Sequence, residues 1–527
     1  MPRAHLRYFF FMLTVAAALS AVRSHGQNAS APRTFLPASI LPAIDRGVVG
    51  DTSHSPGSPE AVVRESMRHS TVALDRTGVS GARYLAGRVI VKFRAGGTAA
   101  SRVRAMSAVS QTASVSERPS YANFDVVRID PAEDAEAVAA ALRGQPDVEY
   151  AQAAYRVHTN FVPNDQFYKE LQWNLPLINL EPAWDIQPAA GSAITVAVLD
   201  TGVAYSTQTV RVHASAFADE NGTIYPALGD LTLNFVAAPD LAPAARFVSP
   251  RDFIWDDNVP LDFDGHGTHV SGTVGQATNN SQGTAGVAFN VKIMPVKVLD
   301  NAWDSIFGAP NFGTDDTVAR GIRFAADNGA KIINMSLGRS GPPAPVVEDA
   351  VKYAVGKGVF IAIAAGNSFE DGNPTEVLAE IASRVAGAVS VAAVGPDKTH
   401  SHYSTTGSYI ELAAPGGTDR GFGRGGYVFQ QSYDFTLTDT FLLPPAQFKA
   451  PRFDVLSYIG YVGTSQASPH VAGVAAMLMQ QGVTDPAAIE EILEKTAVDL
   501  GTPGRDNTFG FGLVDARAAL RGLGLAK

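Results

Sequence analysis

The sequence contains no cysteine among its 527 residues, so neither disulfide bonds nor a catalytic thiolate contributes to this protein. It also lacks a basic excess: 41 Lys and Arg against 51 Asp and Glu leave a formal net charge of −10, and we expect no nucleic-acid partner. Long apolar runs are missing beyond residue 19, so no later segment is predicted to cross a membrane. Stability must therefore come from a large core or from bound metal ions.

The first 26 residues predict an export signal. Basic side chains within the first seven positions precede an apolar stretch at 8–19, and small residues follow it. This stretch is too short for a comfortable transmembrane span, and cleavage after Ser20 or near Gly26 fits it equally. We therefore expect a secreted, extracellular protein whose mature form has no membrane segment.

Composition divides the rest of the chain into three parts. Residues 27–84 are rich in Ser, Pro, Ala and Gly without sustained periodicity, which is typical of a linker or a disordered segment. Residues 85–158 combine short strands with one Ala-rich helix, and we expect a small α+β domain there. Its expected strands are 88–93, 124–129 and 148–152, and its expected helix is 134–142.

The third part, 159–527, alternates near-continuous apolar strands with helices. Strands without polar alternation are typical of a mostly parallel sheet covered by helices on both faces, so we predict a doubly wound α/β fold. In such folds active sites form at the carboxyl ends of the strands. The expected strands are 194–199, 292–299, 331–336 and 359–364, with helices at 316–328 and 346–356 and insertions near 205–237 and 418–458.

Ser465 lies between a tight glycine turn and an apolar helical run, in the segment 463–470 (Gly-Thr-Ser-Gln-Ala-Ser-Pro-His). A hydroxyl at a helix N-terminus is close to unpaired backbone N–H groups and to the positive end of the helix dipole. Such donors suit an attack on a carbonyl, because an oxyanion develops there. A serine before a helix is also an ordinary N-cap, and taken alone Ser465 is best interpreted as one.

Three more polar residues follow strands or begin helices. Asp200 comes directly after a predicted strand, where a catalytic carboxylate and a helix N-cap are equally expected. His266 is flanked by two glycines, which let the backbone approach its neighbours closely. Asn367 ends another strand, and its amide would either donate to an oxyanion or occupy a left-handed turn.

A zinc site at the histidines is not predicted. His266 and His269 are three residues apart and would share one helix face, but no glutamate lies between them and no third ligand follows at a familiar spacing. We interpret His269 and His470 as buried, hydrogen-bonded structural histidines.

The order of four motifs, Asp-Thr-Gly at 200, His-Gly-Thr-His at 266, Ala-Ala-Gly-Asn at 364 and Gly-Thr-Ser at 463, resembles the subtilisin-like serine proteases, or subtilases, over about 160–520. The start of this region is similar to a thermitase-like catalytic domain. The resemblance implies a serine endopeptidase in which Ser465 is the nucleophile, His266 the general base, and Asp200 the group that orients the imidazole. Asn367 and the backbone N–H of Ser465 would form the oxyanion hole.

Two other classes remain as alternatives to a protease. A non-catalytic binding protein with the same fold would not need all four of these polar residues. An exported esterase is disfavoured because the Gly-x-Ser-x-Gly elbow of that class is absent around Ser465.

The resemblance also implies where a substrate binds. One segment would pair with an extended peptide, and a second would form a wall of the pocket for the residue before the scissile bond. Glu376 or Glu380 would favour a basic residue in that pocket, but we expect both to be exposed to solvent. The residues implied are Ser336, Leu337 and Gly338 for the first segment, and Ala364, Ala365 and Gly366 for the second.

Gln466 departs from the family pattern, which usually places methionine beside the nucleophile. A thioether is oxidised to a polar sulfoxide, whereas an amide is not. We therefore predict unusual tolerance to peroxide.

The domain at 85–158 resembles the propeptide of secreted subtilases, which assists folding and then blocks the active site; an unrelated N-terminal domain is the alternative. We expect a self-processed zymogen whose mature form begins near 157–160. Its expected partners are protein or peptide substrates and its own propeptide, and we expect a monomer.

The thermitase-like resemblance implies a structural calcium ion. An all-oxygen set with two carboxylates suits this cation. A second acidic group, Asp252, Asp256 and Asp257, would bind a cation weakly or form an acidic surface loop. The calcium ligands implied are the side chains of Asp165, Asp240 and Asn280 and the carbonyls of Ala277, Gln282 and Thr284.

Overall fold

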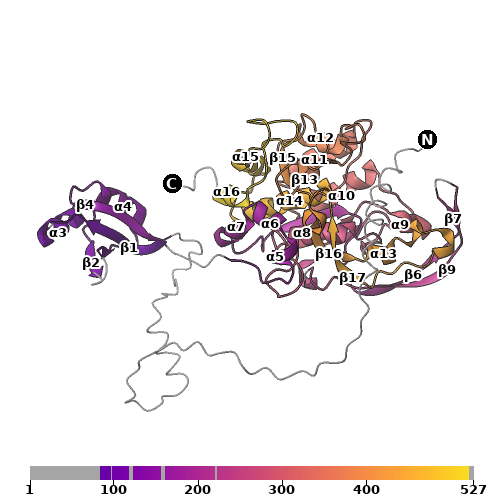
Figure 1. The fold of residues 1–527 in the computed structure, drawn as a ribbon, viewed down its shortest axis with the longest axis horizontal. Coiled ribbons are helices and arrows are strands. Elements are labelled where there is room, and N and C mark those ends of the chain that lie inside the picture. Colours follow the sequence, from indigo (N-terminus) through magenta and orange to yellow (C-terminus); the bar gives the residue numbers. More distant parts are fainter. Residues whose placement is uncertain are drawn as a thin grey trace, which may run out of the picture. The chain divides into compact units, whose positions relative to one another are not determined.

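A computed structural model describes residues 84–96, 98–117, 123–155, 161–219, 222–241 and 243–521. All of them belong to one of the two units of the chain, Gly81–Lys527 (Figure 1). The predicted export signal, the predicted linker up to residue 83 and the predicted maturation boundary at 157–160 lie outside the described residues. No helix among the described residues is long and apolar enough to cross a bilayer.

The N-terminal part of the described chain is a four-stranded antiparallel sheet with two helices. Its strand order is β2-β3-β1-β4, so the last strand pairs with the first. Side chains of β1 alternate between buried and exposed, as expected for a sheet with one covered face. The elements are β1 (Tyr84–Phe93), α3 (Ala99–Ser107), β2 (Ser114–Glu117), β3 (Asp125–Arg128), α4 (Ala135–Arg143) and β4 (Val148–Tyr155).

The rest of the chain is built on a seven-stranded sheet with the order β10-β11-β5-β12-β13-β14-β15, and every neighbouring pair is parallel. The predicted doubly wound α/β fold is confirmed, and the four predicted strands correspond to β5, β11, β12 and β13. The strands are β5 (Thr195–Asp200), β10 (Arg251–Asp252), β11 (Lys292–Lys297), β12 (Ile332–Met335), β13 (Phe360–Ala364), β14 (Ala388–Val394) and β15 (Leu412–Pro415).

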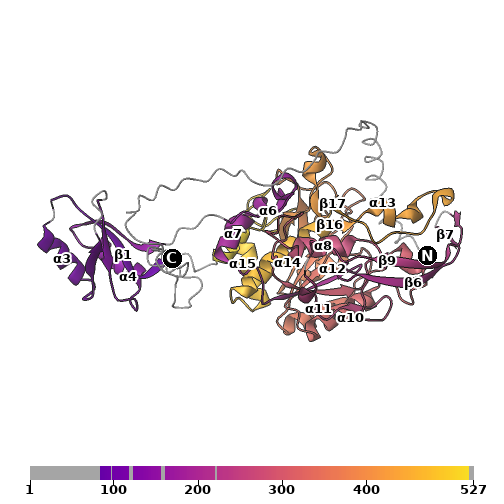
Figure 2. The ribbon, with the colours of Figure 1, turned by 90° about the horizontal axis from the view of Figure 1, so that it is seen from below.

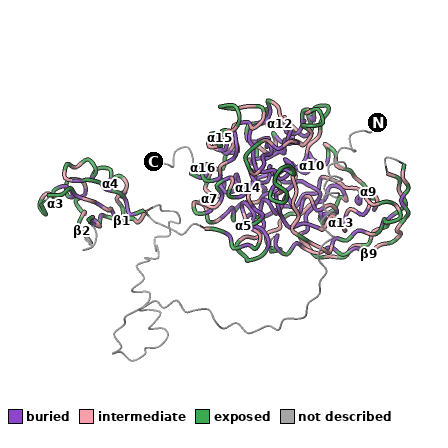
Figure 3. Tube along the Cα trace, viewed as in Figure 1, coloured by how far each residue is buried: buried purple, intermediate pink, exposed green. Residues whose placement is uncertain are grey.

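Helices cover both faces of this sheet. Helices α8 and α14 pack against each other, and α10 packs against α11 in a separate layer (Figure 2). Residues Thr464–Met479 of α14 are all buried, as in a helix that is apolar on every side, and α14 lies in the interior (Figure 3). The helices are α5 (Tyr168–Leu171), α6 (Asn174–Leu177), α7 (Leu180–Ile186), α8 (His266–Gly275), α9 (Ala302–Ile306), α10 (Asp315–Asp327), α11 (Pro345–Gly356), α12 (Val377–Ala382), α13 (Phe435–Thr438), α14 (Thr464–Gln480), α15 (Pro486–Thr496) and α16 (Ala516–Arg521).

The two predicted insertions form hairpins that contact each other. The first contains β6 (Gln208–Ala214) and β9 (Gly229–Phe235), with β7 (Phe217–Ala218) and β8 (Ile224–Tyr225) between them; the second contains β16 (Val428–Tyr433) and β17 (Leu456–Tyr461). Phe235 of the first stacks on Phe453 of the second, with ring centroids 4.6 Å apart. Helix α8 packs against β16. The second insertion therefore supports the helix that begins at His266.

Candidate active site

Asp200 and His266 form a hydrogen-bonded pair at the carboxyl end of β5. The Asp200 carboxylate is fully buried, and its Oδ1 lies 2.7 Å from Nδ1 of His266. The same oxygen accepts a hydrogen bond from the backbone N–H of Thr201 at 2.8 Å. Because Nδ1 faces the carboxylate, it carries the proton, and Nε2 is left as the basic nitrogen of the neutral ring. The His266 side chain is 24% exposed.

The glycines beside His266 are needed for this contact. Gly265 has a φ of 108°, and a Cβ there would lie 2.7 Å from Oγ of Ser432, whose hydroxyl donates to the Gly265 carbonyl. A Cβ at Gly267 would overlap the carbonyl oxygen of Gly202. The motif around His266 therefore reflects close packing of α8 on the turn after β5.

Asp262 anchors the same region and was not identified from the sequence. Its Oδ1 accepts from the Gly265 N–H at 2.8 Å and from the Thr201 hydroxyl at 2.9 Å, while Oδ2 accepts from the Thr268 N–H at 3.0 Å. One buried carboxylate thus joins the start of α8 to the residue after Asp200. An aspartate shortly before a helix start is a capping signal that would have singled it out.

Ser465 lies in the first turn of α14 and is tied to the end of β12. Its Oγ donates to the Ser336 carbonyl at 3.3 Å, and its own carbonyl accepts from Oγ of Ser336 at 2.7 Å. That carbonyl would ordinarily accept from the N–H four residues later, which is Pro469 and has no N–H. The Ser336 hydroxyl therefore replaces a helix hydrogen bond that the sequence of α14 removes.

Asn367, three residues after the end of β13, is oriented by Thr464. The side-chain oxygen of Asn367 accepts from the backbone N–H of Thr464 at 2.9 Å and from its hydroxyl at 3.0 Å. The amide NH₂ consequently faces the other way, and it has no hydrogen-bond partner among the described residues. The N–H of Ser465 is in the first helical turn, where no preceding carbonyl is available to it. Two N–H donors are thus free at the start of α14.

The electrostatics distinguish His266 from the other histidines of this region. Burial lowers the pKa of His266, but the Asp200 carboxylate, with Asp264 and Asp262 beyond it, raises the net pKa to about 9. Burial lowers the pKa of His269 to about 3 and that of His470 to about 4. A charged imidazole is stabilised only where carboxylates face it.

His269 and His470 are fully buried and hydrogen-bonded. His269 Nε2 lies 3.1 Å from the carbonyls of Val428 and Ile459. His470 Nδ1 lies 2.7 Å from the Gln466 carbonyl. Since His269 faces the β16–β17 hairpin and His266 faces Asp200, the two rings do not share a ligand position.

These residues come from neighbouring parts of the sheet edge. Strands β5, β12 and β13 are adjacent, so Asp200, Ser336 and Asn367 follow three consecutive carboxyl ends. Helices α8 and α14 then bring His266 and Ser465 to that edge. In the described residues the Ser465 hydroxyl is hydrogen-bonded to Ser336 and not to His266. Such bonds commonly form only when substrate is bound, and a rotation about the serine side chain changes its acceptor.

The two predicted substrate segments are buried beside this edge. Ser336 and Leu337 follow β12 and are 2% and 4% exposed. Ala364 ends β13 and Ala365 follows it, and they are 3% and 0% exposed. The expectation that Glu376 is exposed is wrong. It is 6% exposed, because its side chain packs against the backbone of both segments.

Glu380 is partly exposed at 43% and pairs with Arg384 at 3.1 Å. It lies one turn after Glu376 in α12 and has this cation as its partner. Glu376 is therefore buried and Glu380 is partly exposed, although we expected both to be exposed from the sequence.

The predicted calcium ligands lie around one loop, and most of them fit a cation. Asp165 accepts from the Asn279 N–H at 2.7 Å through Oδ2, while its Oδ1 is buried with no hydrogen-bond partner among the described residues. Within the described chain, the carbonyls of Ala277, Gln282 and Thr284 accept no hydrogen bond either. Free oxygens of this kind are the ligands that Ca²⁺ prefers.

Asp240 and Asn280 differ from the predicted ligand geometry. Asn280 turns its Nδ2 toward Asp240 Oδ1 at 2.6 Å, and its oxygen accepts from the Gln282 N–H at 2.8 Å. Asp240 Oδ2 accepts from Gln276 Nε2 at 2.9 Å and from the Tyr458 hydroxyl at 3.0 Å. Asp240 is therefore held by protein donors, so Asp165 and the loop carbonyls are the better ligands.

The second predicted acidic group does not form a site. Asp252 is fully buried, and its Oδ1 accepts from the backbone of Ile254 and Trp255. Asp256 is exposed and pairs with Arg251. The three carboxylates thus point into different surroundings.

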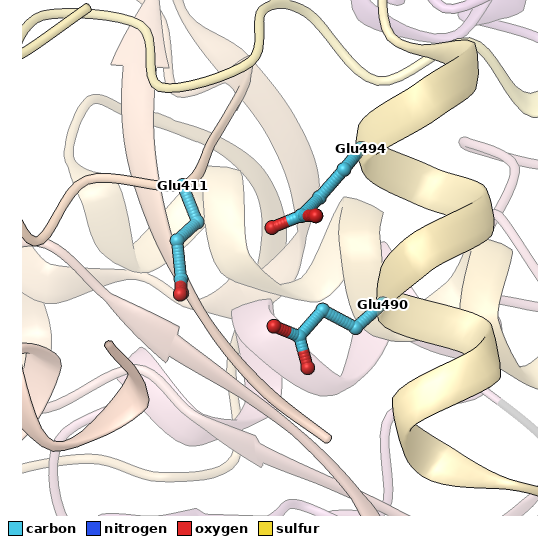
Figure 4. A group of neighbouring side chains, drawn as sticks. All are labelled: Glu411, Glu490 and Glu494. Carbon is cyan, nitrogen blue, oxygen red and sulfur yellow. The ribbon is translucent and has the colours of Figure 1, made fainter. Parts of the chain in front are cut away.

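A different carboxylate cluster lies at the opposite edge of the sheet. Glu490 and Glu494 project from α15 toward Glu411, which immediately precedes β15 (Figure 4). The three carboxylates approach within 4.8 Å of one another. Burial raises the pKa of Glu411 to about 8 and that of Glu494 to about 7. Residues at the amino ends of the strands are remote from Asp200 and Asn367, so this cluster is not part of the candidate active site.

Comparison with known families matches two segments of the chain. The subtilase family matches residues 191–512, and the fervidolysin N-terminal prodomain matches residues 70–153. The first match covers more than half of the chain and contains Asp200, His266, Asn367 and Ser465.

Individual relatives match large parts of the chain. The chain is 30% identical over 437 residues to a thermophilic serine proteinase of Bacillus sp. (strain AK1), which covers 83% of this chain and 88% of that protein. It is 31% identical to thermitase of Thermoactinomyces vulgaris, over 64% of this chain and 92% of that protein. Among solved structures, a protease of Pseudoalteromonas arctica is 30% identical with a TM-score of 0.50, covering 68% of this chain and 99% of that one.

Proposed function

Because this chain belongs to the subtilase family of serine proteases and carries a prodomain of the fervidolysin type, we propose that it is a secreted endopeptidase made as a self-processed zymogen. The observation that carries the proposal is the 2.7 Å contact between His266 and Asp200, at the sheet edge where Ser465 lies in the first turn of α14. An export signal in the first 26 residues supports secretion.

In this proposal Ser465 Oγ attacks the carbonyl carbon of the scissile bond while His266 Nε2 takes its proton. Asp200 keeps the proton of His266 on Nδ1 and stabilises the imidazolium that forms. The oxyanion is bound by the N–H of Ser465 and the NH₂ of Asn367, which are the two donors left free at the start of α14. The C–N bond then breaks, and His266 returns its proton to the leaving amine.

The acyl group remains on Ser465 until water attacks it. His266 takes a proton from that water, and the collapse of the second tetrahedral intermediate returns the proton to Ser465 Oγ and releases the acid. No redox partner or cofactor enters these steps, since each proton removed is given back.

Calcium has a structural role in this proposal. Asp165 and the carbonyls of Ala277, Gln282 and Thr284 would hold it, and Asp240 would add negative charge nearby. A cation bound only by the folded protein raises stability by mass action. We expect excess chelator to lower the melting temperature by several degrees; an unchanged melting temperature would remove calcium from the proposal.

The decisive experiment separates a protease from a binding protein. Ser465 should react with a fluorophosphonate, the purified enzyme should hydrolyse casein, and Ser465→Ala should do neither. Ser465→Ala should also accumulate precursor with its N-terminal domain attached, because self-cleavage needs the nucleophile. A variant that matures normally in pure form would refute self-processing, and lack of labelling in the wild type would refute the enzyme.

A further inference from the structure

Glu376 is a buried carboxylate that the proposed chemistry does not use. It precedes α12 at the N-cap position, yet its side chain makes no capping hydrogen bond. Only 6% of the residue is exposed, and its Oε2 has no hydrogen-bond partner among the described residues. An unpartnered buried carboxylate costs stability, so its retention requires a reason.

The carboxyl group of Glu376 occupies the space between the two predicted substrate segments. A Cβ at Gly338 would lie 2.9 Å from Oε2, and a Cβ at Gly366 would lie 2.8 Å from Oε1 and overlap the Glu376 side chain. These glycines end the two segments, one after β12 and one after β13. Glu376 therefore reaches the pocket between these segments, with its orphaned oxygen on the Gly338 side.

No basic side chain among the described residues is hydrogen-bonded to this carboxylate. Arg339 is the charged neighbour that lowers the pKa of Glu376, but its guanidinium is engaged elsewhere. Its Nε donates to Asp315 at 2.8 Å and its Nη1 donates to the Pro342 carbonyl at 2.7 Å. Burial outweighs this influence and raises the pKa of Glu376 to about 7.

Tyr409 does not satisfy the carboxylate either. Its hydroxyl lies 3.4 Å from Oγ1 of Thr405 and accepts from the backbone N–H of Glu376 at 3.4 Å. The Glu376 carboxylate therefore lies between the two predicted substrate segments with no cation hydrogen-bonded to it among the described residues.

We propose that Glu376 determines the specificity of this pocket and that the preferred substrates carry Lys or Arg immediately before the scissile bond. This inference rests on the proposed endopeptidase function. An ammonium or guanidinium group entering between Gly338 and Gly366 would pair with the orphaned oxygen. Charge-assisted hydrogen bonds of this kind are among the stronger polar contacts in proteins.

The test uses one peptide series that differs only before the scissile bond. Arginine, lysine, citrulline and alanine are compared, citrulline being an uncharged residue shaped like arginine. We expect the wild-type kcat/KM for arginine to exceed that for citrulline on the order of 10²-fold, as for other buried charge pairs. Glu376→Gln keeps the side-chain volume and removes the charge, so it should abolish most of this ratio and lower cleavage after arginine far more than cleavage after alanine.

Glu380→Gln is the matched control, because it removes a partly exposed glutamate of the same helix. It should keep the arginine-to-citrulline ratio of the wild type. A preference for alanine that Glu376→Gln does not alter would overturn the inference, since the glutamate would then only fill space. An equal loss of cleavage after arginine, citrulline and alanine in Glu376→Gln would overturn it as well.

Failure of the proposed function is distinguishable from failure of this inference. If the wild type hydrolyses alanine and citrulline peptides without favouring arginine, the endopeptidase proposal is supported and the proposed role of Glu376 is refuted. If the wild type cleaves no member of the series and does not react with a fluorophosphonate, the endopeptidase proposal itself falls, and the inference falls with it.

Discussion

Replacing Ser336 by alanine should destabilise the fold through the helix that carries Ser465. The Ser336 hydroxyl donates to the Ser465 carbonyl at 2.7 Å and accepts from Nδ2 of Asn334 at 2.9 Å. Ser336→Ala leaves that carbonyl without a donor, because Pro469 has no N–H to offer. A buried polar group left unsatisfied costs about 1–3 kcal/mol.

The expected magnitude is measurable as a rate. If the hydrogen bond is already broken in the transition state for unfolding, the destabilisation of about 1–3 kcal/mol appears mainly in the unfolding rate. It then makes unfolding roughly 5- to 150-fold faster. Unfolding should be followed by fluorescence in guanidinium chloride on enzyme first inactivated with a fluorophosphonate, so that self-digestion does not contribute.

Pro469→Ala provides the matched control because it restores a donor to the same carbonyl. In the double variant the new N–H of residue 469 can bond to the Ser465 carbonyl one turn earlier, so much of the effect of Ser336→Ala should disappear. The reasoning is refuted if Ser336→Ala unfolds at the wild-type rate, or if the two substitutions are simply additive.

Three further predictions concern other parts of the molecule. Because the pKa of His266 is raised to about 9, the proposed general base is mostly protonated below that pH; kcat/KM should rise as pH increases toward 9, and a plateau already reached at pH 7 would contradict this. At the carboxylate cluster, the pKa of Glu494 is raised from 4.5 to about 7, so the folded state keeps a proton that the unfolded state releases, and the free energy of unfolding should fall as pH rises from 4.5 to about 7. Glu494→Gln should flatten that fall by an amount on the order of 1 kcal/mol in denaturant titrations at pH 5 and pH 8, and an unchanged slope would argue against it. Gln466 lies beside the nucleophile without a thioether, so activity should survive dilute peroxide that inactivates Gln466→Met, and rapid loss in the wild type would disprove the prediction.

Four of the central strands could be predicted from the sequence because strands buried on both faces consist of continuous apolar runs. Strands buried on both faces need no polar alternation, and β5 and β13 have none. β14 was not predicted; its sequence, Ala-Val-Ser-Val-Ala-Ala-Val, is short and rich in small residues, which fit a strand or a helix equally well. The apolar pattern therefore identified the strands that bear the candidate site and missed three others of the same sheet, β10, β14 and β15.

Burial of single polar residues was not predictable from local sequence. Glu376 follows Asn-Pro-Thr, a stretch typical of exposed turns, but its side chain packs against Gly338 and Gly366, which follow the neighbouring strands β12 and β13. Ser432 likewise contacts Gly265 from within an insertion, where no motif marks it. Contacts of this kind depend on how separate segments pack in the folded protein, and local sequence patterns do not predict that packing.

The contacts between α8 and the second insertion also limit the order in which parts of the fold can form. Ser432 and Gly265 are separated by 167 residues, and His269 reaches Val428 across 159. Helix α8 therefore lacks its contacts with β16 and β17 until the chain to about residue 460 has been synthesised and has folded back on it. The contacts that hold the start of α8 against the second insertion can therefore form only late in the synthesis of the chain.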